Sequence, residues 1–439
     1  FAELLRQHYG TTASKMAALL GGQADESGDD LEHNFDAFET DDIHRMAEEP
    51  TLVNLVNLVL IEAIQSRTSD VHVEPFEQEL TVRYRINGVL HPQPPPPKHL
   101  QPALIGRIKI MAGMNIAERY IPQDGKISLR YEGRKIDIRV STVPTLYGES
   151  VVMRILDKSQ LRLDFDTLGL RPSLQTSMDR LLAKPHGILL NTGPTGSGKT
   201  TTLYASLTRI FDPSKKIITI EDPVEYELTG INQIPVNAKR GLTFASGLRS
   251  ILRQDPDIIL VGEIRDGETA DIAVASALTG HLILSTLHTN DAISSIGRLV
   301  DMGAEPYLVA SVLEGLLAQR LGRRICEHCR TRVPMPDDLA ARIKPDELEG
   351  FEGHAWHGAG CDKCSGTGFR GRVGFFELLP IHSQLRRAIA SGAAVAALTD
   401  ALPEGFKTMR EGGMDRAREG VTTIQEVLRS TQDAEEVFE

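Results

Sequence analysis

The sequence predicts an α/β protein, in which a parallel sheet with helices on both faces follows a smaller α+β domain and precedes a cysteine-containing, helical region. Three observations support this prediction. A phosphate-binding loop at 193–200 lies between an apolar run and an expected helix. Strand and helix patterns then alternate strictly as far as Asp301, and two C-x-x-C pairs follow. A chain of 439 residues has room for two to four domains.

Composition indicates an ordinary soluble globular protein and excludes several classes. The chain is 41% hydrophobic and 25% charged, and its net charge of −12 argues against a protein built mainly to coat nucleic acid. The sequence contains no run of 18 or more uncharged apolar residues, so it predicts no membrane-spanning helix. No signal peptide is visible, and the start at Phe1 rather than Met is compatible with a further segment upstream.

Residues 1–48 are expected to form a helix that ends near Leu20 and an acidic linker. The stretch from Asp25 to Asp42 holds nine acidic residues and no Lys or Arg. Such a run repels itself and offers little apolar surface to bury, which is typical of a linker. An acidic docking tail is the alternative interpretation.

Residues 49–161 are expected to form the smaller α+β domain. Helical spacing covers 51–65 and resumes at 100–114, and Asn87-Gly88 is a strong hairpin signal. The expected strands contain several arginines, which on sequence alone are best explained as lying on a sheet face exposed to solvent. These include Arg83, Arg85, Arg139 and Arg154. The expected strands are 70–74, 80–86, 126–131, 134–140 and 150–156.

Residues 162–325 are expected to form the parallel-sheet core, after a short linker at 163–172. Ligands of such sheets bind at the carboxyl ends of the strands. A last helix is expected at 307–321. The elements between are helix 199–211, strand 216–221, helix 243–254, strand 257–263, helix 268–279, strand 281–287 and helix 292–301.

The loop fits the pattern G-x-x-x-x-G-K-[ST], in which each residue type has a chemical reason. Glycines let successive backbone N–H groups converge on phosphate oxygens. Lys199 is suited to the β and γ phosphates, and the Thr200 hydroxyl to Mg²⁺. The expected nucleotide-binding residues of the loop are Gly193, Pro194, Thr195, Gly196, Ser197, Gly198, Lys199, Thr200 and Thr201.

Two carboxylates follow neighbouring strands. Glu263 comes directly after the apolar strand 258–261, and because Gly262 occupies the position of the usual aspartate, we expect Glu263 to serve Mg²⁺. Glu221 ends another strand and is the candidate that orients the attacking water, with a capping role as the alternative.

Two histidines bracket the strand 281–287. A neutral histidine beside a phosphate can report whether the γ group is present, although a structural role for each of His281 and His288 is the commoner case. They stand seven positions apart, which puts them on opposite faces of a regular strand.

The four cysteines predict a structural zinc site. Cys326, Cys329, Cys361 and Cys364 form two C-x-x-C pairs that can supply four thiolates to a tetrahedral Zn²⁺. Two disulfides are the alternative, but these require an oxidising compartment that a phosphate-loop protein without a signal peptide is not expected to enter. We assign 326–372 to this module and 373–439 to a helical C-terminal region.

From about residue 50 onwards, the chain resembles the ATPases of bacterial type II secretion and type IV pilus systems, most of all the general secretory pathway protein E family. The resemblance rests on these stretches: SDVHVEP at 69–75, IPQDGKISLR at 121–130, GPTGSGKTTTLY at 193–204, ITIEDPVEY at 218–226, LRSILRQDPDIILVGEIRDGETA at 248–270, LTGHLILSTLHTNDA at 278–292, the four cysteines and GFRGRVGFFELL at 368–379.

The resemblance implies a RecA-like phosphate-loop NTPase core, a PAS-like small domain and hydrolysis of Mg·ATP. It further implies a cytoplasmic homo-hexamer on the inner membrane, which contacts platform proteins through the N-terminal region and the small domain and drives pseudopilus assembly. A nucleic-acid partner is not expected, because the chain is acidic overall and shows no RNA- or DNA-binding module. A type IV pilus assembly ATPase is one alternative. A nucleotide-regulated scaffold with little turnover is an alternative of another class.

The resemblance also implies roles for individual residues. Glu221 serves the attacking water, Glu263 the metal, and His288 belongs to a histidine box with His281. Two further pairs are arginines: Arg139 and Arg154, which the small domain brings over the nucleotide, and Arg249 and Arg253, which line the site. For Arg139 and Arg154 this implication outweighs the solvated-face interpretation, because an arginine finger stabilises a phosphoryl-transfer transition state far more than an exposed ion pair stabilises a fold.

Overall fold

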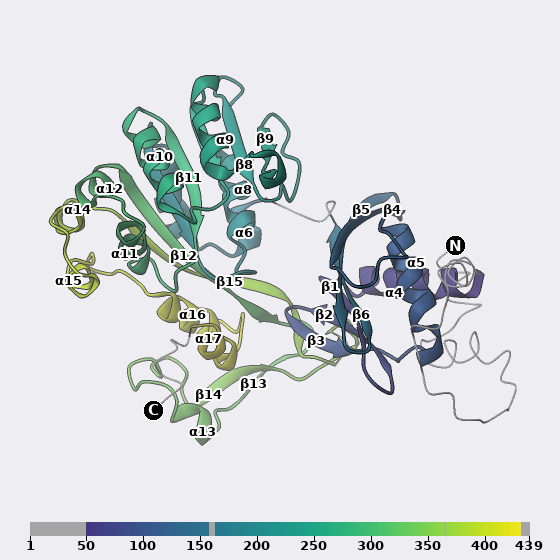
Figure 1. Ribbon diagram of the computed structural model, residues 1–439. Coiled ribbons are helices and arrows are strands. Elements are labelled where there is room, and N and C mark those ends of the chain that lie inside the picture. Colours follow the sequence, from purple (N-terminus) through teal and green to yellow (C-terminus); the bar gives the residue numbers. More distant parts are fainter. Residues whose placement is uncertain (1–49, 158–162, 365, 432–439) are drawn as a thin grey trace, which may run out of the picture. The chain divides into compact units, whose positions relative to one another are not determined.

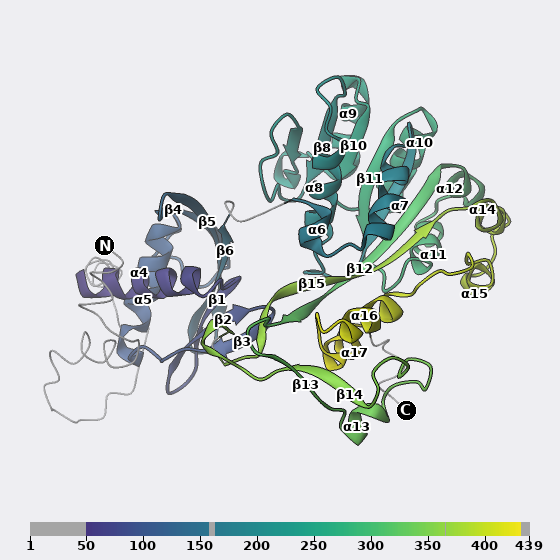
Figure 2. The same cartoon turned by 180° about the vertical axis from the view of Figure 1, so that it is seen from behind.

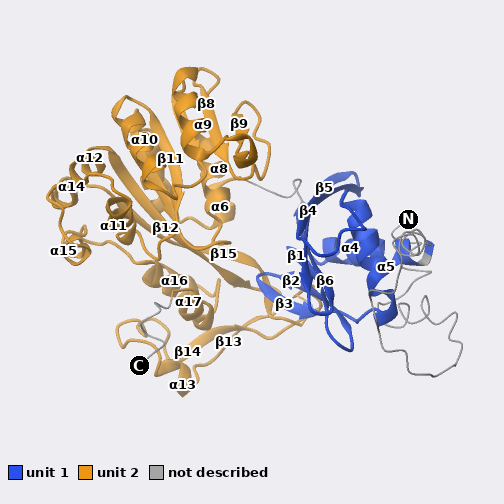
Figure 3. Cartoon of the chain, in the orientation of Figure 1, with its two compact units in different colours: residues 1–161 blue, residues 162–439 orange. Residues whose placement is uncertain are grey.

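The computed structural model describes residues 50–157, 163–364 and 366–431. The chain divides into two compact units, Phe1–Leu161 and Arg162–Glu439 (Figure 3). We describe each unit by itself. The helix and acidic linker expected in residues 1–48 lie outside the described residues.

The first unit is an antiparallel sheet packed against two helices. The six strands follow the order β3-β2-β1-β6-β5-β4. One face of the sheet is covered by α4 (Pro50–Gln65) and α5 (Gln101–Met111), whose apolar side chains join those of the strands in a single core (Figure 1). The strands are β1 (Asp70–Pro75), β2 (Leu80–Ile86), β3 (Val89–Pro92), β4 (Gln123–Tyr131), β5 (Arg134–Thr145) and β6 (Gly148–Asp157), and a 3₁₀ turn, η2, spans Lys98–Leu100.

A buried ion pair joins α5 to β6 in this unit. Lys109 is fully buried, and its Nζ lies 2.7 Å from Oε1 and 2.9 Å from Oε2 of Glu149. The same Nζ donates to the carbonyl oxygen of Glu118 at 2.5 Å, which ties the loop after α5 to the sheet. Each buried charge therefore has a partner, as burial in a medium of low polarity requires.

The second unit is built on a seven-stranded sheet of order β15-β12-β7-β11-β10-β8-β9. All its neighbouring strands run parallel except the pair of β12 and β15, which is antiparallel. The strands are β7 (Gly187–Thr192), β8 (Ile217–Glu221), β9 (Asn232–Pro235), β10 (Ile258–Val261), β11 (Leu282–Leu287), β12 (Leu313–Ile325) and β15 (Phe369–Pro380).

Helices cover both faces of this sheet (Figure 1 and Figure 2). One core contains side chains of α7 and α8, and the other contains side chains of α9, α10, α11 and α12. Successive residues of β7 divide between the two, since Leu189 belongs to the first core and Ile188 and Leu190 to the second. The helices are α6 (Phe165–Leu168), α7 (Pro172–Leu182), α8 (Lys199–Ile210), α9 (Phe244–Ile251), α10 (Gly267–Leu278), α11 (Ser294–Asp301) and α12 (Pro306–Val312), with η4 (Ala238–Arg240) and η5 (Leu252–Gln254).

Two expectations for this unit were wrong. The helix expected at 307–321 ends with α12, and from Leu313 onwards the chain is a strand that pairs with β7 on one side and β15 on the other. Four leucines in 313–321 have helical spacing, but pairing on both edges decides the structure. The linker expected at 163–172 contains the short helix α6.

Helices α16 (Met409–Arg418) and α17 (Ile424–Thr431) pack beside the long ribbon of β12 and β15 (Figure 2). A two-stranded sheet of β13 (Arg330–Pro334) and β14 (His354–Gly358) lies between the two strands in sequence, with α13 (Asp337–Ala340) and η6 (Asp362–Cys364). Helices follow, as expected: α14 (Ser383–Ala390), α15 (Val395–Thr399), α16 and α17. Among the described residues, no helix combines the length and apolarity needed to span a bilayer.

Candidate functional site

The loop between β7 and α8 has the backbone geometry of an anion cradle. Gly193, Gly196 and Gly198 adopt φ values of 148°, 80° and 91°, which residues other than glycine rarely adopt. Gly198 caps α8 without any side-chain hydrogen bond to the first turn, so the helix N-terminus offers its amides to a ligand. The buried hydroxyl of Ser197 has no hydrogen-bond partner among the described residues. These features fit a bound phosphate.

Lys199 reaches back over this loop. Its Nζ donates to the carbonyl oxygens of Gly193 at 2.7 Å and Pro194 at 3.1 Å. The pKa of Lys199 is lowered to about 8, mainly by burial; Glu263 raises it and Arg320 adds a smaller lowering contribution. The ammonium therefore lies where phosphates would bind, within electrostatic reach of the predicted metal-binding acid. Thr200 is exposed and Thr201 half-buried in the first turn of α8.

Glu263 lies at the same edge of the sheet as the loop. Strand β11 separates β7 from β10, so the carboxyl ends of β7 and β10 are about 10 Å apart. A carboxylate oxygen of Glu263 lies 2.5 Å from Nη2 of Arg265, and the other lies 3.4 Å from Nε2 of His288. Burial alone would raise the pKa of Glu263, but Arg265 and His288 outweigh it and hold the pKa below its ordinary value. The carboxylate is thus kept ionised, as a metal ligand must be.

Packing explains why the acid follows Gly262 rather than replacing it. The Gly262 N–H donates to the carbonyl oxygen of Ile220 at 2.8 Å. A Cβ at this position would lie 3.2 Å from that oxygen and 3.3 Å from Cα of Glu221. A side chain would therefore crowd β8, and the next residue, Glu263, has the nearest position with room for a carboxylate.

Glu221 lies at the end of β8, inside a buried network. Its carboxylate accepts hydrogen bonds from the hydroxyl of Tyr204, from Thr219 Oγ1 at 2.5 Å and from Gln233 Nε2 at 3.1 Å. Its side chain is 3% exposed, whereas Asp222 beside it is exposed. None of these partners belongs to the phosphate loop, and the assignment of Glu221 to the attacking water stays a prediction.

The two histidines lie at opposite ends of β11. His288 follows the strand and joins Glu263 at the loop edge of the sheet. His281 precedes the strand, and its Nδ1 lies 2.8 Å from the carbonyl oxygen of Ser276 in α10. A six-residue strand spans about 20 Å, so only His288 is near the loop.

The arginines predicted to line the site within the core lie around the end of α9. Arg249 is half exposed and forms an ion pair with Glu268 at 2.5 Å. Arg253 donates to the backbone of Arg249 at 3.0 Å and to Ser250 at 3.3 Å. These contacts are local to α9 and the start of α10, so a nucleotide-binding role for either arginine remains a prediction.

The other two predicted arginines belong to the first unit, on the sheet face away from α4 and α5. They form part of a row of side chains in register across the sheet: Lys126, Arg139, Arg154, Asp70 and Arg85. Asp70 is the acid within this row, and Arg154 Nε donates to it at 2.8 Å. Asp137 lies on the same side of the sheet and pairs with Lys126 at 3.0 Å. The four cations outnumber these two acids, so this positive stripe keeps a net positive charge suited to an anionic partner.

Two polar residues of β12, within the stretch 307–321 expected to be helical, also lie against the phosphate loop. The fully buried side chain of Gln319 donates to the Ser197 carbonyl. Arg320 donates to Asn290, just beyond His288, and lowers the pKa of Lys199. In the sequence, these residues stand out as a polar pair inside the apolar run LLAQRL. Only the strand assignment shows that they face the phosphate loop.

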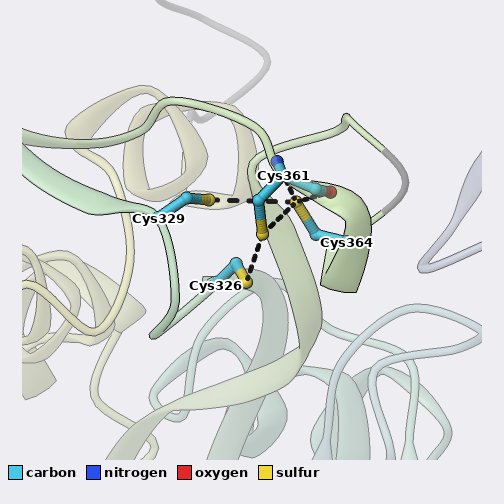
Figure 4. A group of neighbouring side chains, drawn as sticks. All are labelled: Cys326, Cys329, Cys361 and Cys364. Carbon is cyan, nitrogen blue, oxygen red and sulfur yellow. Dashed lines mark hydrogen bonds between the residues drawn. The ribbon is translucent and has the colours of Figure 1, made fainter.

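The four cysteines converge as predicted (Figure 4). Their sulfur atoms lie within 4.8 Å of one another, and the separations are 3.8 Å for Cys326–Cys361, 3.8 Å for Cys329–Cys364 and 3.7 Å for Cys361–Cys364. A tetrahedral zinc site with Zn–S bonds of about 2.3 Å has sulfur–sulfur edges of about 3.8 Å. All four are free thiols, so the geometry fits zinc and not disulfides.

The two cysteine pairs come together because the end of β12 and the start of β15 are joined by backbone contacts. Cys326 directly follows β12, and its N–H donates to the carbonyl oxygen of Gly368, just before β15, at 2.9 Å. Gly368 has φ +74°, and a Cβ there would lie 2.3 Å from the oxygen of Gly358. Only glycine fits this crossing of two backbones.

A phosphate loop on a parallel sheet, with an ionised acid at the end of a nearby strand, defines a phosphate-loop NTPase. The chain belongs to the family described as Type II/IV secretion system protein, which matches residues 45–429. A relative from Klebsiella pneumoniae, named Type II secretion system protein E, is 50% identical over 395 residues, which cover 90% of this chain and 78% of the relative.

Solved structures support the fold. The pilus retraction motor PilT with bound ADP is 27% identical, with a TM-score of 0.56 over 86% of this chain and 97% of that one. The ATPase DotB of Legionella pneumophila is 20% identical, with a TM-score of 0.63 over 87% of this chain and 97% of that one. Together the comparisons confirm the predicted family, the phosphate-loop ATPase core and the assignment to type II secretion.

Proposed function

We propose that this chain is the motor of a type II secretion system, a homo-hexamer on the cytoplasmic face of the inner membrane that hydrolyses Mg·ATP to drive pseudopilus assembly. The family and the name of the relative that is 50% identical support the secretion role. The N-terminal region and the small domain are the proposed contacts with the membrane platform, and zinc in the cysteine cluster holds the ends of β12 and β15.

The proposed chemistry is in-line attack of water on the γ phosphate, with the protein supplying position and charge. The loop amides and Lys199 hold the phosphates, and Thr200 and Glu263 hold Mg²⁺, which neutralises phosphate charge when bound. Glu221 orients the water, and His288 responds to the γ phosphate through Glu263, its neighbour at 3.4 Å.

Arginines complete the proposed site from two directions. Arg249 and Arg253 line it from the core, while Arg139 and Arg154 approach with the small domain and stabilise the charge that develops on the transferred phosphoryl group. Movement of the small domain is then the step that converts hydrolysis into force. The positive stripe that contains Arg139 and Arg154 supports this assignment.

The observation that carries the proposal is the electrostatic coupling at the loop edge of the sheet. Lys199 lies over the loop, and the field of Glu263 acts on its pKa. Glu263 itself is kept ionised by Arg265 and His288. A cation for phosphate and an anion for metal therefore lie within reach of each other, as Mg·ATP requires.

Phosphate release by Glu263→Gln tests this proposal. We expect turnover to fall on the order of 100-fold, because a neutral amide is a poor metal ligand, while binding of ADP without metal stays close to that of the wild type. Asp271→Asn is the matched control, since it removes one exposed carboxylate from α10 in the same unit. Wild-type turnover in Glu263→Gln would contradict the assignment.

A further inference from the structure

Gln319 is a buried amide at the point where β12 passes the phosphate loop. Its side chain is 0% exposed. The pairing of β12 with β7 ends one residue earlier, at Ala318 opposite Thr192, so Gln319 lies beside the start of the loop. A glutamine is rarely buried this completely unless its polar atoms are satisfied.

The amide of Gln319 joins three segments around the loop. Its Nε2 donates to the carbonyl oxygen of Ser197 at 2.7 Å. Its Oε1 accepts from Thr202 Oγ1 in α8 at 2.7 Å and from Asn191 Nδ2 in β7 at 2.8 Å. A carbonyl oxygen can only accept a hydrogen bond, so the amide nitrogen of Gln319 must face Ser197. The amide oxygen then faces the Thr202 hydroxyl, which can donate to it.

The contact with Ser197 determines the direction of the next amide in the loop. In a planar trans peptide, C=O and N–H point in opposite directions. Fixing the Ser197 carbonyl on Gln319 therefore fixes the Gly198 N–H on the other side of the peptide plane. The packing is close, because a Cβ on Gly198 would lie 3.0 Å from Gln319 Nε2 and one on Gly193 would lie 2.5 Å from the Gln319 carbonyl oxygen.

We propose that Gln319 is a positioning residue for nucleotide binding, which holds the phosphate loop in its binding shape without touching the nucleotide. The inference rests on the proposed role of the loop as the nucleotide site, but not on the motor function. Strand β12 pairs with β15 in a long ribbon (Figure 2) and ends directly before Cys326. The amide of Gln319 therefore also makes this ribbon part of the nucleotide site.

Replacement of Gln319 by glutamate separates positioning from simple packing. Glutamate keeps the size and the oxygen that accepts from Thr202 and Asn191, but an ionised carboxylate places a second oxygen against the Ser197 carbonyl. Protonation restores a donor at that place. The affinity of Gln319→Glu for nucleotide should therefore recover as the pH falls, whereas Gln319→Leu, which lacks both polar atoms, should be weak at every pH.

The test measures binding of fluorescent ADP to the full chain at pH 8 and pH 6, with each variant expressed relative to wild type at the same pH. We expect Gln319→Leu to bind about tenfold or more weakly, because it leaves buried polar groups without partners. Gln319→Glu should be similarly weak at pH 8 and several-fold closer to wild type at pH 6.

Gln101→Glu in the first unit is the matched control. Gln101 is 2% exposed and donates to the carbonyl oxygen of Tyr147 at 2.7 Å, so the same change buries the same charge far from the loop in sequence. We expect its relative ADP affinity to be the same at both pH values.

Wild-type affinity in Gln319→Leu, or equal relative affinity of Gln319→Glu at both pH values, would overturn the inference. If Gln319→Leu does not fold, Gln319→Glu alone decides through its pH dependence. Failure of the wild-type chain to bind ADP would instead overturn the nucleotide site itself.

Discussion

Nucleotide binding should be accompanied by proton uptake at Lys199. Burial lowers the pKa of this ammonium to about 8 in the free protein, so near neutrality a part of the population is uncharged. A phosphate group beside Nζ favours the charged form and raises the pKa towards or beyond its ordinary value of 10.5. A group whose pKa rises on binding takes up protons from solution in the pH range between the two values.

The expected amount follows from the two pKa values. A group with a pKa of about 8 is about one tenth deprotonated at pH 7, about one half at pH 8 and about nine tenths at pH 9. Binding of ADP should therefore take up about half a proton at pH 8 and most of one at pH 9. Phosphate groups of the nucleotide are already ionised in this range, so they contribute little.

Calorimetry in buffers of different ionisation enthalpy measures this uptake directly. Lys199→Arg is the control, because guanidinium stays protonated at every pH used and its binding should show no uptake at pH 8 or 9. Binding by the wild type without proton uptake at pH 9 would refute the argument that burial holds Lys199 partly neutral.

Three further predictions concern the two units. Lys109→Met should destabilise the first unit by about 3–5 kcal/mol, because it leaves the buried Glu149 without its partner, and adding Glu149→Leu should recover most of the loss. Hydrogen exchange of the full chain measures both effects, and equal protection in Lys109→Met and wild type would contradict the prediction. Arg139→Ala and Arg154→Ala should each retain ADP binding but lower turnover on the order of 1,000-fold, so wild-type turnover in both would exclude the finger role. Cys361→Ser should lower the zinc content from about one ion per chain and lower the melting temperature; purified wild type without zinc would count against the site.

Local chemistry made much of this protein predictable from sequence. The phosphate loop is identified by its glycines and Lys199, and the alternation of apolar runs with helical spacing gave the parallel sheet and the positions of Glu221 and Glu263 at strand ends. The four cysteines required only their spacing. For the loop and the strand ends the signal lies within a few residues of the feature that it predicts, and for the cysteines it lies within each C-x-x-C pair.

The errors arose where distant partners decide the structure. Residues 313–321 contain good helix formers at helical spacing, and only the edges of β7 and β15 make them a strand. The burial of Gln319 follows from that strand, so its contact with Ser197 could not be inferred either. The hydrogen-bond partners of Glu221, Tyr204 and Gln233, come from other elements and could not be inferred either, while its assignment to the attacking water stays a prediction.

If ATP turnover drives export, secretion by cells that carry Glu263→Gln must fail together with turnover. We expect such cells to accumulate the variant at normal levels, the purified variant to bind ADP, and export to be lost. Normal export by cells whose Glu263→Gln protein has no measurable turnover would contradict the motor and favour a nucleotide-regulated scaffold.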